Sequence, residues 1–250
     1  MNNLAGFNDG CNIGGNDLFS FLVIGQSNMA GRGNLDEVEP IDNFRCYMLR
    51  NGRFIRMSEP LNVDRAIFGK GFTSGIGLAP SFANEFANTL KQRIGLIPCA
   101  DGGTSISEWQ PGEILYEHAV FMTKLAMRNS IFSGFLWHQG ETDANRRTSS
   151  GEYRIKLINF INSIRRDLNA ENLPFILGEL SEKISPEIVP TDEIRRINSV
   201  IREVADALPC CAVVSADGLS IKSDGLHFDS QSLRKFGKKY FDVYMGVKNA

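Results

Sequence analysis

The sequence contains no long hydrophobic run, no marked excess of charge of one sign and only three histidines. A membrane-spanning helix needs about 20 consecutive apolar residues, so we expect no membrane anchor. The 27 basic and 29 acidic residues leave a net charge of −2. With that balance the chain lacks the excess of basic residues by which proteins bind nucleic acids or anionic membranes. We expect neither as a partner.

Cysteine is scarce, and its positions exclude two further classes of protein. The five cysteines are an odd number, Cys210 and Cys211 are adjacent, and there is no Cys-x-x-Cys pair. This spacing argues against a disulfide framework and against a thiolate metal site. We therefore expect reduced thiols in a reducing compartment.

The amino-terminal segment lacks the marks of a signal peptide. Residues 1–17 carry no positive charge and no apolar core segment, so we expect no signal peptide and a cytoplasmic protein. Secretion would require that a leader had been removed from a longer precursor. The segment is rich in asparagine and glycine, and we expect it to be frayed.

Short apolar runs are present, and they alternate with amphipathic segments. Buried parallel strands have this nearly uniform hydrophobicity, which is found at residues 19–24, 94–99, 131–137, 174–180 and 211–214. Apolar residues at helical spacing predict helices over residues 81–93, 118–126, 153–168, 192–207 and 233–244. We therefore predict one α/β domain over residues 18–250, with a parallel sheet covered by helices on both faces.

One pair of strands departs from this alternation. Residues 45–49 and 53–57 flank Asn51-Gly52, a dipeptide that favours the tight turn of a β-hairpin. We expect this hairpin to be an antiparallel appendage of the core. An irregular loop follows it, and Asn62 to Arg65 in that loop could overhang a pocket.

Polar residues cluster where four of these segments end. The clusters are Gly25–Asn28, Gly102–Ser105, His138–Glu141, and a later loop that contains Asp224 and His227. Because the carboxyl ends of parallel strands share one edge of a sheet, we expect the clusters to converge there. The sequence therefore predicts a site built from residues that are far apart along the chain.

Three residues of these clusters have the chemistry of a serine hydrolase. A serine hydroxyl is a poor nucleophile until a base accepts its proton. His227 is the best candidate base, because Asp224 precedes it by three residues. At that spacing the carboxylate can meet the ring Nδ1–H and leave Nε2 for Ser27. Asp217, in a second Asp-Gly-Leu, is the alternative orienting acid.

Ester hydrolysis also needs donors for the oxyanion of the tetrahedral intermediate. Candidates are the backbone N–H of Ser27, a backbone N–H of Gly102 or Gly103, and the side-chain amide of Gln139. Each has a structural alternative, since paired glycines are common in loops and a glutamine can simply cap a strand end. Asp-Gly is likewise an ordinary turn.

Taken together, these segments resemble the SGNH-hydrolase superfamily. Its carbohydrate-esterase branch, which includes sialate O-acetylesterases and acetylxylan-esterase-related proteins, is similar at Gly25-Gln26-Ser27-Asn28-Met29, Gly102-Gly103-Thr104-Ser105-Ile106, Trp137-His138-Gln139-Gly140-Glu141 and Asp224-Gly225-Leu226-His227. The resemblance covers residues from about 18 to 244. It implies a three-layer α/β/α fold with a five-stranded parallel sheet in the order 2-1-3-4-5.

The resemblance also implies roles for individual residues. Ser27 would be the nucleophile, His227 the base and Asp224 its orienting partner. One glycine of the Gly102-Gly103 pair would complete the oxyanion hole, and Gln139 would stand where the superfamily usually has an asparagine donor. The resemblance implies no cofactor and no metal, and an acetyl ester of a small sugar or an oligosaccharide as the substrate.

Further residues in or near these motifs are candidates for binding the substrate: Gln26, Asn28, Arg65, Thr104, Trp109, His138 and Glu141. Two other functions would use the same fold. A longer-chain acyl esterase or thioesterase would need a long apolar groove beside the serine. A catalytically inactive protein would bind carbohydrate on aromatic side chains without turnover.

Overall fold

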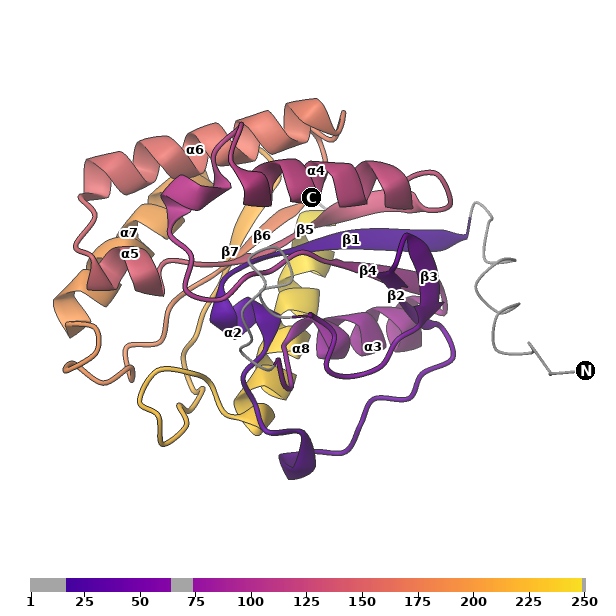
Figure 1. The fold of residues 1–250 in the computed structure, drawn as a ribbon, viewed down its shortest axis with the longest axis horizontal. Helices are drawn as coiled ribbons and strands as arrows, with labels where there is room; N and C mark the ends of the chain where they lie inside the picture. Colours follow the sequence, from indigo (N-terminus) through magenta and orange to yellow (C-terminus); the bar gives the residue numbers. More distant parts are fainter. Residues whose placement is uncertain (1–16, 64–73, 249–250) are drawn as a thin grey trace, which may run out of the picture.

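A seven-stranded sheet crosses the centre of the molecule (Figure 1). The computed structural model describes residues 17–63 and 74–248. The strands lie in the order β3-β2-β4-β1-β5-β6-β7, and every neighbouring pair is parallel except β2–β3. Their bounds are β1 (Leu18–Gly25), β2 (Cys46–Arg50), β3 (Arg53–Arg56), β4 (Arg93–Pro98), β5 (Ile131–His138), β6 (Phe175–Gly178) and β7 (Cys211–Val214).

Helices cover both faces of this sheet and give the molecule three layers. α4, α6 and α7 lie on one face, and α3 and α8 lie on the other (Figure 1). The helices are α2 (Ser27–Ala30), α3 (Ala79–Leu90), α4 (Ile114–Ala126), α5 (Glu141–Asn145), α6 (Ser150–Asp167), α7 (Thr191–Ala207) and α8 (Ser230–Lys248), with short 3-10 helices η1 (Leu35–Glu37) and η2 (Ile106–Trp109). None of the helices in the described part of the chain combines the length and the hydropathy of a membrane span.

Aromatic side chains pack the sheet against both helical layers. Towards α3 and α8, Phe21 of β1 packs edge-on against Phe82 and Tyr244, with ring centroids 5.0 and 5.1 Å away. Towards α4 and α6, Trp137 of β5 packs edge-on against Trp109 at 5.4 Å. Full burial of one such apolar side chain stabilises the fold by about 1.5–3 kcal/mol, so the two central strands are firmly held.

The sheet has two more strands than we predicted, and the hairpin is the reason. The five predicted strands are β1, β4, β5, β6 and β7, and they lie in the expected order. The hairpin is part of the same sheet, because β2 pairs in parallel with β4 and β3 forms the edge. Residues 46–49 of β2 are all buried, and they cover an edge of β4 that would otherwise leave backbone groups unpaired.

β1 ends at Gly25, and this glycine places the residues that follow. Its φ is +132°, and a Cβ atom there would lie 2.1 Å from the carbonyl oxygen of His138. Only glycine allows β1 and β5 to approach so closely at their carboxyl ends. The N–H of Gln26 donates to the same carbonyl oxygen at 2.9 Å, and the turn delivers Ser27 to the start of α2.

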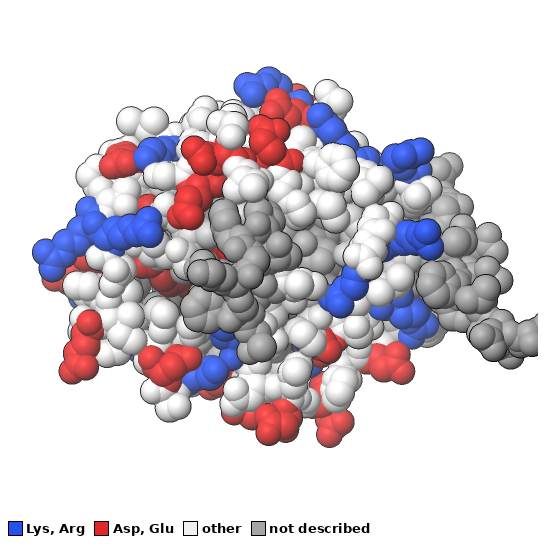
Figure 2. Space-filling model, in the orientation of Figure 1, with Lys and Arg blue, Asp and Glu red and all other residues white. Residues whose placement is uncertain are grey.

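Charged side chains of both signs are spread over one face of the molecule. On the face shown in Figure 2, acidic and basic side chains are interspersed, as a net charge of −2 allows. The amino-terminal segment that we expect to be frayed lies outside the described residues, apart from Asp17.

Candidate active site

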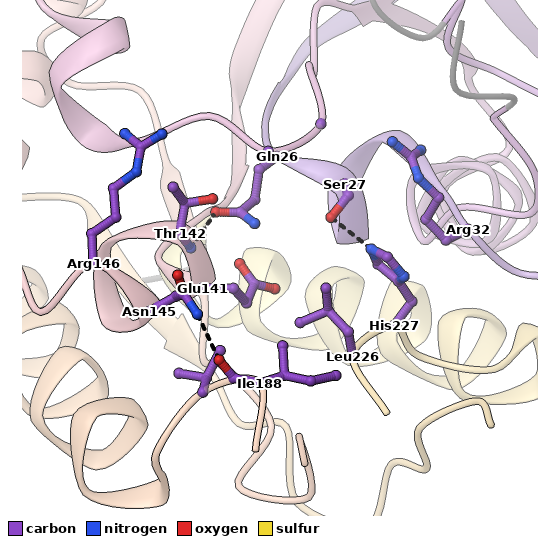
Figure 3. A pocket seen from close by; sticks show the side chains of 13 residues that line it. Gln26, Ser27, Arg32, Glu141, Thr142, Asn145, Arg146, Ile188, Leu226 and His227 are labelled. Atoms are coloured by element: carbon purple, nitrogen blue, oxygen red, sulfur yellow. Dashed lines mark hydrogen bonds between the residues drawn. The ribbon is translucent and has the colours of Figure 1, made fainter. Parts of the chain in front are cut away.

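Ser27 lies at the carboxyl edge of the sheet, in the turn from β1 into α2. Its side chain is nearly buried, with 6% of the residue exposed. The loop after β7 brings His227 against it, and His227 Nε2 lies 2.9 Å from Ser27 Oγ (Figure 3). Two residues separated by 200 positions are therefore within hydrogen-bond distance.

Asp224 holds the other side of the same imidazole ring. Its Oδ2 lies 3.0 Å from His227 Nδ1, and its Oδ1 accepts the backbone N–H groups of Leu226 and His227, each at 2.9 Å. Burial acts to raise the pKa of Asp224, but these donors outweigh burial and lower the pKa to about 2. The ionised carboxylate accepts a hydrogen bond from the Nδ1–H group of His227. Nε2 of the neutral ring is then an acceptor for the serine hydroxyl.

The loop that carries both residues is closed and tied down. Ile221 and Phe228 form an antiparallel bridge across it. Lys222 Nζ donates to the carbonyl oxygen of Arg32 at 2.8 Å and lies 3.7 Å from Asp224 Oδ2. The three-residue spacing of the acid and the base is thus held in a fixed turn.

Asp217, the alternative orienting acid, lies elsewhere. Its backbone carbonyl accepts from Lys239 Nζ at 2.6 Å, and the residue lines a separate cavity with Glu179 and Arg202. The structure therefore brings only Asp224 of the two candidate acids to His227.

A cavity of about 380 Å³ opens over Ser27 and His227 (Figure 3). Gly102 and Gly103 line it beside the serine, and Gly103 has a φ of +75°. A side chain would be strained at that φ, so the backbone next to the nucleophile stays uncovered. The backbone N–H groups of this segment remain the expected oxyanion donors.

The wall of the cavity contains residues that sequence reasoning missed. Ile188, Val189 and Leu226 form an apolar part, and Arg32 and Arg146 lie at opposite sides of the opening (Figure 3). The segment with Ile188 and Val189 follows β6, so its place at the carboxyl edge was the signal available in the sequence. No motif in that segment draws attention to it.

A second and more polar cavity, of about 690 Å³, adjoins the first. Asn34, Asp36 and Lys222 line it, and it shares Arg32 and His227 with the first cavity. A substrate larger than an acetyl group therefore has room to extend away from the serine.

Gln139, the predicted side-chain oxyanion donor, does not line the cavity over Ser27. Its side chain is fully buried, and its amide nitrogen lies 2.6 Å from Asp143 Oδ2 and 3.0 Å from the Thr104 carbonyl oxygen. An amide nitrogen has two hydrogens, so both are engaged inside the protein. Burial raises the pKa of Asp143, and the Gln139 amide is held by this carboxyl group and by the Thr104 carbonyl inside the protein.

Four of the predicted substrate contacts are buried in the protein. Asn28, Thr104, Trp109 and His138 are each at most 2% exposed, and none lines the cavity. Trp109 Nε1 donates to Thr104 Oγ1 at 3.1 Å, while Asn28 and His138 both bond to Glu141. These motif side chains face the protein interior, where a buried polar group needs a hydrogen-bond partner.

Arg65, another predicted substrate contact, lies outside the described residues. The remaining two, Gln26 and Glu141, do line the cavity. Gln26 Oε1 accepts the N–H groups of Gly140 and Thr142 at 3.2 and 3.3 Å. These donors set the orientation of the amide, and its nitrogen points to the side on which Ser27 lies (Figure 3).

The described residues offer no site for a metal ion, since no three His, Cys, Asp or Glu side chains are grouped in a way that could hold one. Cys46, Cys99, Cys210 and Cys211 are free thiols. Burial raises the pKa of Cys46 and of Cys99, so both behave as small apolar side chains at neutral pH.

The comparison with protein families agrees with this geometry. The family described as carbohydrate esterase, sialic acid-specific acetylesterase, matches residues 18–246, which is nearly the whole chain. The chain belongs to this family. Membership of this family indicates a hydrolase that acts on esters, and the cavity over Ser27 is the candidate active site.

Relatives of this chain cover most of its length. A probable carbohydrate esterase of Arabidopsis thaliana is 30% identical over 249 residues, covering 90% of this chain and 89% of that protein. An X-ray structure from the same organism has a TM-score of 0.80 at 30% identity and covers 92% of this chain and 98% of that chain.

More distant structures share the fold. A carbohydrate acetylesterase of Xanthomonas citri has a TM-score of 0.59 at 18% identity, over 92% of this chain and 56% of that chain. A lipase from a goat rumen metagenome has a TM-score of 0.55 at 13% identity, over 89% and 94% of the two chains. These likenesses show the α/β architecture of SGNH hydrolases, as the sequence predicted.

Proposed function

We propose that this carbohydrate esterase removes O-acetyl groups from an acetylated sugar by Ser–His–Asp acyl-enzyme catalysis. One observation carries the proposal: Ser27 Oγ lies 2.9 Å from His227 Nε2, and the other ring nitrogen faces the ionised carboxylate of Asp224. The family description supports a carbohydrate ester as the substrate class.

The reaction would proceed in two steps. Ser27 Oγ bonds to the acetyl carbonyl carbon while His227 Nε2 takes the hydroxyl proton, and the sugar oxygen then leaves with that proton. Water repeats the sequence on the acetyl-serine, giving its proton to Nε2 and releasing acetate and the free serine. Asp224 stays ionised and stabilises the imidazolium that forms in each step.

We further propose Gln26 as the side-chain oxyanion donor, in place of Gln139. The backbone N–H groups of Ser27 and of the Gly102-Gly103 segment would supply the other donors. The Gln26 amide is preorganised, because the N–H groups at the start of α5 hold its oxygen. Preorganised donors of this kind stabilise the transition state more than the ground state.

Gln26→Glu should lower kcat for a small acetyl ester by about 10²–10³-fold and leave KM nearly unchanged. Glutamate keeps an oxygen for the α5 donors but replaces the N–H donor with a negatively charged acceptor. Steady-state kinetics would measure the effect, with Gln231→Glu on the exposed side of α8 as the matched control. A Gln26→Glu variant with at least about a third of the wild-type kcat would rule out this donor.

Acetate release from a panel of acetylated xylose, glucose, sialic acid and oligosaccharides is the direct test of the proposed function. Release from at least one of these sugars is expected. Glycan binding without release of acetate from any ester would instead support an inactive carbohydrate-binding protein.

A longer-chain acyl esterase is the second candidate, because Ile188, Val189 and Leu226 give the cavity an apolar wall. The polar opening with Arg32 and Arg146 favours a small acyl group on a polar alcohol. In a series of p-nitrophenyl esters we expect kcat/KM to be highest for acetate and to fall about tenfold or more by eight carbons. A maximum at eight carbons or longer would favour the second candidate.

A further inference from the structure

A second histidine–carboxylate pair lies inside the protein, close to the first. His138 Nε2 is 3.0 Å from Glu141 Oε1, and the two side chains are 0% and 2% exposed. His138 Nδ1 has no hydrogen-bond partner among the described residues, so a ring proton on Nε2 is the one that finds an acceptor. The reaction proposed above uses neither residue.

Asn28 connects this buried pair to the reacting groups. Its Nδ2 donates to Glu141 Oε1 at 2.6 Å, and its Oδ1 accepts the backbone N–H of Phe228 at 3.1 Å. Asn28 directly follows Ser27, and Phe228 directly follows the catalytic histidine in sequence. One buried amide therefore joins the two chain segments that carry the nucleophile and the base.

The turn that carries Ser27 is held on both sides by the start of α5. On the amino-terminal side, Gln26 Oε1 accepts two backbone N–H groups from that region. On the carboxyl-terminal side, Asn28 binds Glu141. Only the second link continues to the loop of His227, so Glu141 is where a change would reach both partners of the proton transfer.

We propose that Glu141 is a positioning residue: by holding the Asn28 amide it keeps His227 at hydrogen-bond distance from Ser27. The inference rests on the proposed function, since it concerns the same nucleophile and base. The Nδ2 contact decides which end of the Asn28 amide faces the loop, and only the oxygen end can accept the Phe228 N–H. Proton transfer is sensitive to this alignment, because a misplacement of about 1 Å can lower turnover about 100-fold.

The test begins with three variants assayed on a small acetyl ester. Glu141→Leu should lower kcat about 100-fold with little change in KM, because the residue offers substrate almost no surface. Glu141→Gln keeps an oxygen that accepts from Asn28, and should restore kcat to within about fivefold of wild type. Asn28→Ala should lower kcat about as much as Glu141→Leu does.

Non-additivity separates positioning from a general loss of stability. Glu141 and Asn28 act through one contact, so the double variant Asn28→Ala/Glu141→Leu should have a kcat no lower than that of Asn28→Ala. Asn198→Ala is the matched control, because Asn198 is also buried and also bonds two backbone groups, the N–H and C=O of Leu180. It should lower the melting temperature and leave kcat per folded molecule unchanged.

Three results would overturn the inference, each measured on variants shown to be folded by circular dichroism. The first is a kcat within about threefold of wild type in Glu141→Leu or, where that variant does not fold, in Asn28→Ala. The second is a Glu141→Gln variant whose kcat is no higher than that of Glu141→Leu. The third is a double variant in which the losses of kcat are additive. A wild-type chain that hydrolyses no acetyl ester would contradict the proposed function itself. A fully active wild type with fully active Asn28→Ala would contradict the positioning role alone.

Discussion

Replacing Ser27 by alanine should lower kcat for a small acetyl ester by about 10⁶-fold and leave the fold intact. The hydroxyl oxygen is the atom that would bond to the acetyl carbon. In the proposed reaction His227 accepts a proton from this hydroxyl or from water, so the variant has only water left as a proton donor. Its removal also takes away one hydrogen bond to a partly exposed ring, which costs only about 1 kcal/mol. Acetate release and circular dichroism would measure the two effects separately.

A control and a covalent probe make this experiment decisive. Ser199→Ala changes an exposed serine on α7 and should have wild-type turnover. A phosphonate ester should transfer its phosphonyl group to the serine oxygen and release its leaving alcohol with the serine proton. The mass of the phosphonyl group should therefore appear on the wild-type chain and on Ser199→Ala, but not on Ser27→Ala. A Ser27→Ala variant that kept about a tenth of wild-type turnover would contradict the proposed nucleophile.

Asp224→Asn should lower kcat by about 10⁴-fold, the second-largest effect. The asparagine Oδ1 can still accept the N–H groups of Leu226 and His227, so the loop should keep its shape. Its Nδ2 would face the ring Nδ1 as a donor, which favours the tautomer with the proton on Nε2. That tautomer presents a donor to Ser27 where an acceptor is needed, so the serine loses its base.

Asp217→Asn is the matched control for this prediction. It makes the same change in the neighbouring Asp-Gly-Leu, at a residue that lines a different cavity. We expect its kcat to stay within about twofold of wild type. A crippled but folded Asp217→Asn variant beside a nearly normal Asp224→Asn variant would reverse the assignment of the orienting acid.

The main features of the fold follow from local patterns in the sequence. Uniformly apolar runs that alternate with amphipathic segments predict a parallel sheet between helices, and five strands take their expected order. The hairpin was predicted as a hairpin but not as part of the sheet. Its pairing with β4 depends on a free strand edge that only the assembled sheet presents, and no local pattern at Cys46–Met48 reports it.

The candidate site divides in the same way. Ser27 and His227 could be brought together from the sequence because each follows a buried strand, and such ends share one edge. Asp224 could be preferred over Asp217 because its three-residue spacing to the histidine is a local property. The sequence did not indicate which of the two glutamines lines the cavity, since both Gln26 and Gln139 follow a strand within a polar motif.

Local sequence alone determined the α/β class, the edge at which the polar motifs meet, and the Asp224–His227 pair, because hydrophobic period and short-range spacing act within a few residues. The tertiary structure alone decided which motif side chains face the cavity and which face the core. That choice depends on partners more than 100 positions away, as in the contacts of Gln26 with Gly140 and of Asn28 with Glu141. A buried amide takes whichever distant donor or acceptor the packed chain offers it, because an unpaired one is costly.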